Sequence, residues 1–292
     1  MANIEKVNGR GREQQMDQTT RPNLVNDQQF KEKYGPWALV TGASAGIGAA
    51  FSEELAAKGL NVVLLARGEE RLLQLASRLE NDYGVDVRTA SVDVSAENFM
   101  DAVNSVTDDL EVGLVVNNAG VAEKGPFLDN SLEGELRTLY VNNRAPITLA
   151  HAFGRRMRDR GRGGIIFIGS TIGFAPAPYF SNYSASKAHL LYLSDGLGYE
   201  LREHGVDVLT VSPGPTKTDM LVRMIGNASM PGIPQMAPRD VAVIGLRALG
   251  RKASVVPGMR NSFMAFMISR LLPRRLSTTM LGKTNRSLIE TS

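Results

Sequence analysis

A tyrosine and a lysine in the second half of the chain have the types and spacing that proton transfer needs. Tyr183 and Lys187 are four residues apart in a segment of helical character, so their side chains would lie side by side on one helix face. An ammonium group favours the phenolate form of a neighbouring phenol, whose ordinary pKa is about 10, so the sequence predicts a lowered pKa for Tyr183. Tyr183 could then exchange a proton with a carbonyl or alcohol oxygen. An isolated pair of this kind is more often a surface pair, but Ser170, thirteen residues upstream, weakens that interpretation.

A glycine-rich turn earlier in the chain is suited to holding a phosphate group. Residues 41–48 read Thr-Gly-Ala-Ser-Ala-Gly-Ile-Gly, directly after an apolar run and at the start of a segment with helical periodicity. Glycines let the backbone turn tightly and approach a pyrophosphate, and the helix N-terminus presents free N–H groups to it. The spacing differs from the usual G-x-G-x-x-G fingerprint, and a lone turn of this kind is a weak signal. Its strand, loop and helix context predicts a dinucleotide site formed by Gly42, Ser44, Gly46, Ile47 and Gly48.

The end of the second apolar run indicates which dinucleotide is preferred. An acid about 20 residues beyond the glycine turn would bind a free ribose 2′-hydroxyl, but Ala66 stands at that position. The neighbouring Arg67 can bind a 2′-phosphate, with Ser44 or Arg71 assisting. The sequence therefore predicts NADP(H) in preference to NAD(H), and an ordinary solvated arginine is the competing interpretation of Arg67.

Short apolar runs that alternate with longer segments of helical period must position these residues. This alternation is typical of an α/β protein, and it predicts a single doubly wound Rossmann-type domain in which a seven-stranded parallel sheet carries helices on both faces. The predicted strands cover residues 37–41, 61–66, 85–92, 112–116, 164–169, 206–212 and 254–257. The predicted helices cover residues 47–58, 69–82, 96–108, 134–160, 182–204 and 238–249.

Taken in chain order, the motifs resemble those of the classical short-chain dehydrogenase/reductase family over roughly residues 36 to 260. Besides the glycine turn and the serine, tyrosine and lysine, the resemblance rests on Asp93-Val94, Asn117-Asn118-Ala119-Gly120, Tyr140-Val141-Asn142-Asn143 and Pro213-Gly214-Pro215-Thr216-Lys217-Thr218. The Tyr34-Gly35-Pro36-Trp37 lead-in and the extended C-terminus look nearest to the branch of membrane-associated 3-ketoacyl and hydroxysteroid reductases.

For catalysis, the resemblance implies a set of four residues. Tyr183 is expected to protonate a carbonyl oxygen, and Ser170 to hold that oxygen. Lys187, together with the charge of the oxidised nicotinamide, is expected to lower the pKa of Tyr183, and Lys187 is also expected to hydrogen-bond the nicotinamide ribose. Asn142 is expected to support a water molecule that connects Lys187 to solvent, although the adjoining Asn143 could hold this role instead. Because all four residue types are present, the resemblance disfavours a family member that only senses its cofactor.

For cofactor binding, the resemblance adds residues from the ends of other strands. Asp93 and Val94 are expected to contact the adenine ring. Asn118, Ala119 and Gly120 are expected to line the cofactor and to steady the central sheet. The turn after the sixth predicted strand is expected to receive the nicotinamide carboxamide through Pro213, Gly214, Thr216 and Thr218.

The substrate pocket is expected to be apolar. By resemblance, it is shaped by the segment after Ser170 and by residues 213–238, which are rich in proline and methionine. The residues expected to line it are Ile172, Phe174, Tyr179, Met220 and Met224. An apolar lining favours an aliphatic or alicyclic carbonyl compound over a sugar or a highly charged metabolite, unless these side chains simply belong to the core.

The composition fits one globular domain and excludes several kinds of site. The chain has 292 residues, of which 43% are apolar, and it has no cysteine, which excludes disulfides, zinc-thiolate sites and thiol nucleophiles. The three histidines lack ligand spacing, so no metal is expected. The formal net charge is +3, and residues 251–292 alone carry eight Lys and Arg against one acid, Glu290. Because the basic charge is confined to this end, nucleic-acid binding is not expected.

The two ends of the chain are expected to lie outside the catalytic domain of residues 34–259. Residues 1–33 are polar, so we expect a mostly mobile tail that is neither a signal peptide nor a membrane span. Residues 260–292 are expected to form a basic amphipathic extension that contacts an anionic membrane surface or an acidic acyl carrier, or else docks on the protein body. We expect a cytoplasmic protein that could associate peripherally with membranes. By resemblance, its helices over 134–160 and 182–204 would pair chains in a homodimer or homotetramer.

We therefore predict an NADPH-dependent enzyme that reduces an apolar ketone, aldehyde or ketoacyl group to an alcohol, with Tyr183 as the general acid. One alternative is an NAD-linked alcohol or hydroxysteroid dehydrogenase that works in the oxidative direction. Another alternative is a protein that binds NADP(H) without turnover, as a sensor or a membrane scaffold.

Overall fold

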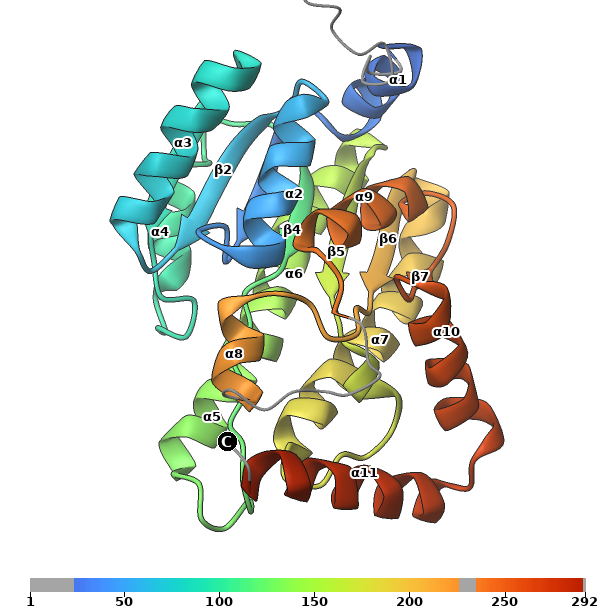
Figure 1. The fold of residues 1–292 in the computed structure, drawn as a ribbon. Coiled ribbons are helices and arrows are strands. Elements are labelled where there is room, and N and C mark those ends of the chain that lie inside the picture. Colours follow the sequence, from blue (N-terminus) through green and yellow to red (C-terminus); the bar gives the residue numbers. More distant parts are fainter. Residues whose placement is uncertain (1–23, 226–234, 291–292) are drawn as a thin grey trace, which may run out of the picture.

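The computed structural model describes residues 24–225 and 235–290, which are built around a seven-stranded sheet (Figure 1). The strands are β1 (Trp37–Thr41), β2 (Asn61–Ala66), β3 (Val87–Ser91), β4 (Val112–Asn117), β5 (Gly163–Ile168), β6 (Val206–Val211) and β7 (Ser254–Val255). Every neighbouring pair is parallel, and the order across the sheet is β3-β2-β1-β4-β5-β6-β7. The predicted doubly wound α/β fold is confirmed.

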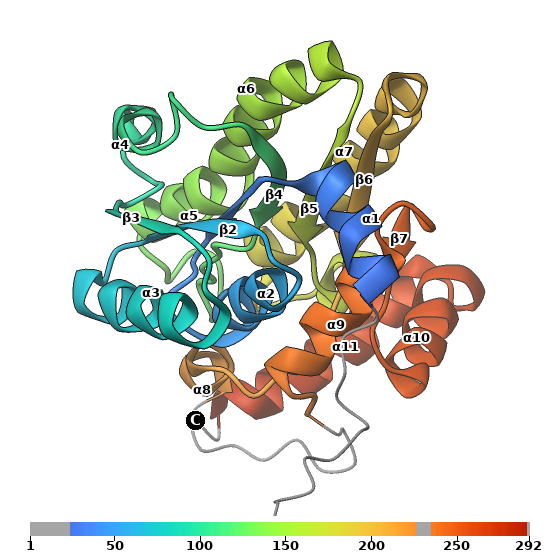
Figure 2. The ribbon, with the colours of Figure 1, turned by 90° about the horizontal axis from the view of Figure 1, so that it is seen from above.

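Helices cover both faces of the sheet (Figure 2). One face carries α2 (Gly46–Ala57), α3 (Glu69–Tyr83) and α9 (Pro238–Ala248), and the other carries α4 (Phe99–Ser105), α6 (Ala145–Arg160) and α7 (Ser181–Leu201). In β1, Ala38 and Val40 pack into one core cluster and Leu39 packs into the other. Because both faces are covered, the central strands β1, β2, β4 and β5 are mainly apolar and do not alternate with polar residues, whereas β3 at the edge carries Arg88, Thr89 and Ser91.

The fold brings the carboxyl ends of the central strands together at one edge of the sheet. The winding reverses at β1, which lies between β2 and β4, and ligands of open α/β sheets bind at such a reversal. The glycine turn follows β1, residues 118–120 follow β4, and Ser170 follows β5. Motifs that are far apart in the sequence therefore meet at this edge.

Shorter helical segments complete the carboxyl edge. The long helix predicted over residues 134–160 is composite, because α5 (Leu132–Leu139) continues through a π-helical turn, η2 (Tyr140–Arg144), into α6. A 3-10 turn, η3 (Thr171–Phe174), follows β5, and α8 (Asp219–Ile225) follows β6. At the opposite, amino edge of the sheet, another 3-10 turn, η4 (Arg202–His204), ends α7 and precedes β6.

The N-terminal part of the described chain differs from expectation. The predicted tail is wrong for residues 24–33, which together with Tyr34 form α1 (Leu24–Tyr34). Phe30 and Tyr34 pack against the core cluster on the α2 face, and Tyr34 Oη donates a hydrogen bond to Asp207 Oδ2 at 2.5 Å. The rest of the predicted tail, residues 1–23, lies outside the described residues.

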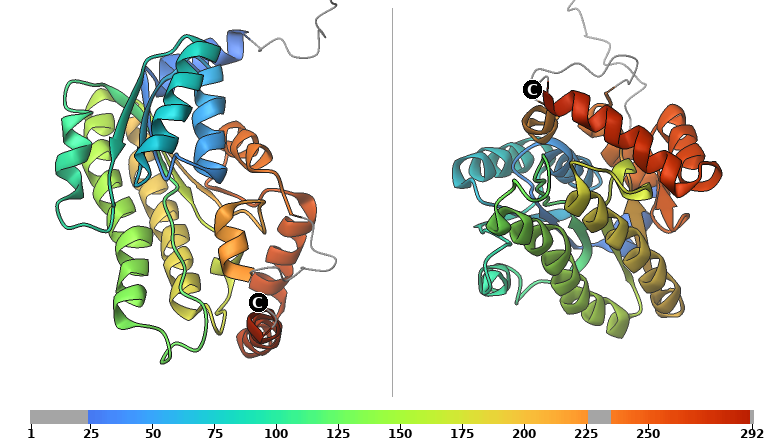
Figure 3. Two further views of the ribbon diagram at one scale, coloured as in Figure 1. Left: turned by 60° about the vertical axis from the view of Figure 1, so that its left-hand side comes forward. Right: turned by 90° about the horizontal axis from the view of Figure 1, so that it is seen from below.

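The C-terminal extension folds onto the body of the protein. It consists of α10 (Met259–Phe266), a π-helical turn, η5 (Met267–Leu271), and α11 (Arg274–Glu290). The predicted helices end at residue 249, and for residues 260–292 only a basic amphipathic extension is expected, so α11 is an unpredicted element. It crosses the lower end of the molecule in Figure 1, and its C-terminal end lies beside α8 (Figure 3). Within the described residues, no helix combines the length and the apolar character needed to cross a membrane.

Candidate active site

The structure brings Ser170, Tyr183 and Lys187 together, as predicted. Ser170 stands between β5 and η3, and Tyr183 and Lys187 lie in the first two turns of α7. A hydrogen bond joins the side chains of Ser170 and Tyr183. Lys187 Nζ lies 5.7 Å from the centre of the Tyr183 ring and donates a hydrogen bond to the carbonyl oxygen of Ile168 at 2.8 Å. Tyr183 and Lys187 are only 7% and 3% exposed, so a phenol and an ammonium group share a nearly dry environment.

Burial changes the acid strength of both groups. It raises the pKa of Tyr183 to about 12, and the hydrogen bond with Ser170 only partly opposes this shift. Burial also lowers the pKa of Lys187 to about 8. The predicted lowering of the Tyr183 pKa also counted on the charge of an oxidised nicotinamide. In the protein alone the pKa is raised, because burial disfavours the phenolate by more than the hydrogen bond with Ser170 favours it. At neutral pH Tyr183 carries its proton and Lys187 is mostly charged.

Asn142 lies in the π-helical turn η2 and is fully buried. Its Oδ1 accepts a hydrogen bond from the Val121 N–H at 2.9 Å, and its Nδ2 donates to the Val121 carbonyl and to Ser186 Oγ, both at 2.9 Å. A side chain at Gly120 would begin 3.6 Å from both Asn142 Oδ1 and Lys187 Nζ. Asn142 therefore lies on the Lys187 side of the site.

The neighbouring Asn143 points elsewhere. Its Nδ2 donates to the carbonyl oxygen of Ser186 at 3.0 Å, and its side chain lines a groove between η2 and α7. Of the two adjacent asparagines, the position of Asn142 is thus the one that fits the expected relay.

The glycine turn, residues 41–48, lies at the N-terminus of α2 and is called the cradle below. Gly42 and Gly46 have left-handed backbones, with φ of 64° and 58°. A Cβ at Gly42 would lie 2.8 Å from Asn118 Nδ2, and a Cβ at Gly48 would lie 2.3 Å from the Gly42 carbonyl oxygen. Ala45 is the N-cap residue of α2, and its methyl side chain cannot accept a hydrogen bond from the first N–H groups of the helix. The turn therefore fits a dinucleotide pyrophosphate, which would accept those N–H groups at the positive end of the helix dipole.

Asn118 and Thr41 tie the glycine turn to the end of β4. Thr41 Oγ1 accepts the N–H groups of Asn118 and Ala119 at 3.0 and 2.9 Å. Asn118 Nδ2 donates to the carbonyl oxygens of Thr41 and Gly42 at 2.9 and 3.2 Å. These bonds link β1 to the segment after β4, as the sequence analysis predicted for the steadying of the central sheet, and they fix Ala119 and Gly120 beside the cradle.

The residues predicted for the adenosine end lie at the ends of β2 and β3. Arg67 follows β2 with an exposed side chain, whereas Arg71, its predicted helper, pairs with Asp219 of α8 at 3.2 Å. Asp93 accepts hydrogen bonds from the backbone and side chain of Ser95 and from Arg137 at 3.1 Å, which lower its pKa although partial burial opposes them. The other predicted residue, Val94, is buried in the core cluster on the α6 face.

The turn after β6 closes the site from the other side. The Thr171 N–H donates to the carbonyl oxygen of Pro213 at 3.0 Å, which joins the loops that follow β5 and β6. Thr218 accepts the N–H of Leu221 at the start of α8, and its methyl group lies 2.9 Å from where a Cβ at Gly46 would stand. The predicted Gly214 and Thr216 lie between these contacts, and the Thr216 hydroxyl donates to the Gly214 carbonyl at 3.0 Å.

An apolar cluster surrounds Tyr183. Its buried members are Ala177, Phe180 and Tyr183, and the partly buried side chains packed against them are Ala122, Ile172, Tyr179, Met220, Met224 and Ile289. Four of the five predicted pocket residues belong to this cluster, and Phe174 does not. Sequence reasoning missed Ile289, because it lies on α11, and the small Ala122 and Ala177, which no motif marks.

Comparisons with known proteins agree with this geometry. A family model described as short chain dehydrogenase matches residues 36–227. The chain is 31% identical over 240 residues to the 7beta-hydroxysteroid dehydrogenase of Collinsella aerofaciens, covering 80% of this chain and 89% of that protein. It is 36% identical over 259 residues to the very-long-chain 3-oxoacyl-CoA reductase of Meyerozyma guilliermondii, covering 84% of this chain and 75% of that protein.

A solved structure leads to the same assignment. The short-chain dehydrogenase from Sphingobium yanoikuyae in complex with NADPH is 34% identical and matches with a TM-score of 0.71 over 81% of this chain and 93% of that one. Sequence, fold and the arrangement of Ser170, Tyr183 and Lys187 therefore agree. The chain belongs to the short-chain dehydrogenase/reductase family of oxidoreductases, which act on hydroxyl and carbonyl groups.

Proposed function

We propose that this enzyme uses NADPH to reduce the carbonyl group of an apolar substrate to an alcohol. The observation that carries the proposal is the buried Tyr183, which contacts Ser170 and Lys187 on one side and an apolar cluster on the other. A proton donor beside an apolar cluster suits a substrate with one polar, reactive group and a hydrophobic remainder.

Each catalytic side chain has a separate task. When bound, NADPH supplies a hydride to the carbonyl carbon. Tyr183 donates its hydroxyl proton to the carbonyl oxygen, and Ser170 holds that oxygen with a hydrogen bond. Lys187 stabilises the phenolate that remains on Tyr183, and Asn142 supports the path by which Lys187 exchanges protons with solvent.

The protonation state of Tyr183 suits a general acid. Its pKa of about 12 keeps the phenol protonated throughout the physiological range. A protonated phenol is ready to donate to a carbonyl oxygen, whereas alcohol oxidation would need the phenolate as a base. The protonated form found in the protein alone is therefore the form that the proposed reduction uses.

The residues around the cradle fit NADPH. Ala66 leaves the end of β2 without an acid, and the exposed Arg67 beside it can bind a 2′-phosphate. The relative from Sphingobium yanoikuyae, which was solved in complex with NADPH, supports this preference.

The substrate class follows from the cluster around Tyr183. The side chains packed against this cluster are aliphatic, thioether or aromatic, and they include Ile172, Tyr179, Met220, Met224 and Ile289. Two relatives are named for a hydroxysteroid and for a very-long-chain 3-oxoacyl-CoA. We therefore propose ketones with large ring systems or long acyl chains as substrates.

The test is consumption of NADPH with a panel of ketosteroids, 3-ketoacyl thioesters of graded chain length and small ketones. We expect turnover that rises with apolar size and disappears in Tyr183→Phe, while NADPH binding to this variant persists. NADPH binding without turnover of any panel member would favour the cofactor-sensing alternative.

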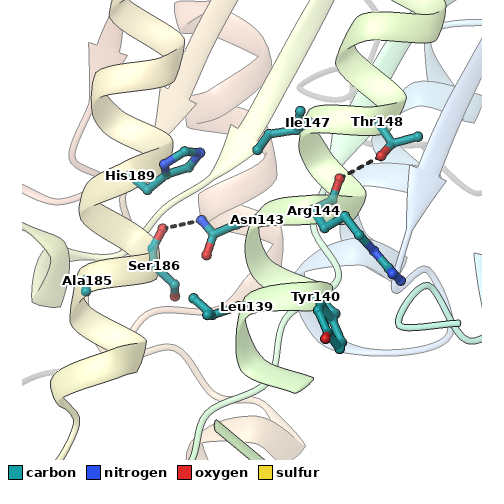
Figure 4. Close-up of a pocket in the computed structure, with 9 residues that line it drawn as sticks. All are labelled: Leu139, Tyr140, Asn143, Arg144, Ile147, Thr148, Ala185, Ser186 and His189. Atoms are coloured by element: carbon teal, nitrogen blue, oxygen red, sulfur yellow. Dashed lines mark hydrogen bonds between the residues drawn. The ribbon is translucent and has the colours of Figure 1, made fainter. Parts of the chain in front are cut away.

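The outer face formed by η2, α6 and α7 is proposed to pair two copies of the chain. A groove of about 470 Å³ lies there, lined by Leu139, Tyr140, Asn143, Arg144, Ile147, Thr148, Ala185, Ser186 and His189 (Figure 4). Tyr192 and Tyr199 are seven residues, or about two helical turns, apart on α7, and their side chains are 83% and 81% exposed. Mass measurement by light scattering should give a dimer or tetramer, and Tyr192→Glu should dissociate it, whereas Tyr83→Glu on α3 should not.

The C-terminal extension is proposed to contact an anionic membrane surface. Residues 241–289 contain no acidic side chain, and the exposed apolar residues of α10 and η5 include Phe263, Met264 and Leu271. Vesicles containing phosphatidylserine should bind the protein at low salt and release it at high salt. The double variant Arg274→Glu/Arg275→Glu should lose this binding, and equal binding to phosphatidylcholine vesicles would contradict the proposal.

A further inference from the structure

Helix α11 is fastened to the loop that precedes α7. Asn285 is 7% exposed, and its Nδ2 donates a hydrogen bond to the carbonyl oxygen of Pro178 at 2.9 Å. One helical turn earlier, a Cβ at Gly282 would stand only 3.2 Å from Pro178 Cγ, so the glycine allows the helix to approach closely. The contact joins two segments 107 residues apart in sequence.

The residue after this contact has an unusual backbone. Tyr179 has φ of 68°, the left-handed conformation that L-residues with a side chain rarely adopt, and it is the only residue other than glycine with positive φ in the part of the chain that the structure describes. Two hydrogen bonds hold it from both sides. Asn285 binds the carbonyl oxygen of Pro178, and the carbonyl oxygen of Tyr179 accepts the N–H of Gly125 at 2.9 Å.

This conformation decides where the Tyr179 ring lies. The ring packs into the apolar cluster with Tyr183, Met224 and Ile289. If the backbone of Tyr179 relaxed to a right-handed or extended form, the direction of its Cα–Cβ bond would change and the ring would leave this cluster. The packing of Tyr179 in the apolar cluster around Tyr183 thus depends on a hydrogen bond from the C-terminal helix.

An asparagine at position 285 is suited to holding the backbone of the loop before α7. A buried amide loses its hydration, so packing alone would be served better by an apolar side chain. Asn285 instead provides an N–H donor at the point where the loop presents a carbonyl oxygen.

We propose that Asn285 is a positioning residue that sets the preference for large substrates, by holding Tyr179 in its left-handed conformation within the apolar cluster around Tyr183. The inference rests on the proposed reduction of apolar carbonyl compounds. A large ring system or long chain reaches Tyr179, whereas a small ketone that contacts only Tyr183 and Ser170 does not.

The first test separates binding of large substrates from catalysis. Asn285→Asp keeps the size of the side chain and removes its N–H donor, and Thr284→Ala is the matched control, because the exposed Thr284 hydroxyl bonds only within α11 to the Met280 carbonyl. We expect KM for the best large ketone to rise about tenfold in Asn285→Asp, with kcat and the turnover of a small ketone within about twofold of wild type. An equal loss for both substrates, or no loss for either, would overturn the proposal.

The second test uses Tyr179→Gly. Glycine adopts the left-handed conformation without support, so Asn285→Asp should have no further effect on KM in a Tyr179→Gly background. Additive effects of the two substitutions would contradict the link between Asn285 and the Tyr179 backbone.

The third test does not depend on turnover. Hydrogen exchange should accelerate at the Gly125 N–H in Asn285→Asp and not in Thr284→Ala, because this N–H is protected by the Tyr179 carbonyl oxygen. Unchanged exchange would refute the positioning role even if the proposed activity proved wrong. Turnover by wild type with altered exchange but unchanged KM would refute the specificity role alone.

Discussion

The ammonium nitrogen of Lys187 lies 5.7 Å from the centre of the Tyr183 ring, and both side chains are almost fully buried. The same burial acts on the two groups in opposite directions. It favours the neutral form of each, so it strengthens the hold of Tyr183 on its proton and weakens that of Lys187. Four consequences of the site geometry can be measured.

Reduction should slow as the pH rises through about 8. The pKa of Lys187 is lowered to about 8, so its charge, which stabilises the phenolate formed on Tyr183, is present below that pH and lost above it. The measurement is kcat/KM for the ketone between pH 6 and pH 10, within a range where the fold is intact. In Lys187→Arg, whose side chain stays charged, the decrease in kcat/KM should disappear or move to higher pH. A wild-type profile that is flat up to pH 10 would contradict the role assigned to Lys187.

Lys187→Met should stabilise the fold at neutral pH while it abolishes turnover. The folded pKa of about 8 lies below the ordinary lysine value of 10.5, so folding disfavours the charged lysine by about 3 kcal/mol at pH 7. The unfolded chain binds more protons between these two values, so stability should rise with pH there and the advantage of Lys187→Met should shrink from pH 7 to pH 9. Urea unfolding should show a gain of about 1–3 kcal/mol at pH 7. The exposed Lys283→Met on α11 is the control and should change stability little.

Arg67→Ala should weaken NADPH binding about tenfold or more and leave NADH binding nearly unchanged, because only NADPH carries the 2′-phosphate. Titration of both cofactors by calorimetry or fluorescence measures this difference. Arg71→Ala should affect NADPH less, since Arg71 already pairs with Asp219 at 3.2 Å. An equal loss of both cofactors in Arg67→Ala would remove the basis for the NADPH preference.

Gly46→Ala should impair cofactor binding and stability together. The residue has φ of 58°, and its new Cβ would meet the Thr218 methyl group at 2.9 Å, so the turn or the start of α8 must shift. The backbone alone costs about 1–2 kcal/mol. Gly196→Ala in α7 is the control, because nothing lies within 4 Å of its added Cβ and the helix favours alanine. Equal behaviour of the two variants would count against a fitted cradle at Gly46.

The sequence was informative where a local pattern determines the structure. The buried central strands are apolar on both faces, so each strand was visible as an apolar run in the sequence. The order of the motifs indicated the family, and with it the grouping of Ser170, Tyr183 and Lys187 in one site. The π-helical turn at η2 carries no comparable signal, so the helix over residues 134–160 was predicted as regular.

Two of the helices that the sequence analysis did not predict, α1 and α11, are rich in polar residues. In α11 the buried residues are Ser277 and Asn285, so no apolar period marked the helix, and its contribution of Ile289 to the apolar cluster around Tyr183 was missed with it. The polar composition of α1 hid the packing of Phe30 and Tyr34 in the same way. The burial that raises the pKa of Tyr183 in the protein alone could not be predicted, because it depends on segments far away in the sequence.

The most direct test of the account follows a deuterium label from the C4 position of reduced nicotinamide in NADPH into the product of the best ketone. We expect deuterium on the carbinol carbon of the alcohol made by wild type, and no labelled alcohol from Tyr183→Phe although this variant still binds NADPH. Labelled alcohol formed by Tyr183→Phe at the wild-type rate would contradict the role of Tyr183, and NADPH binding by wild type without transfer to any large or small ketone would contradict the proposed reaction itself.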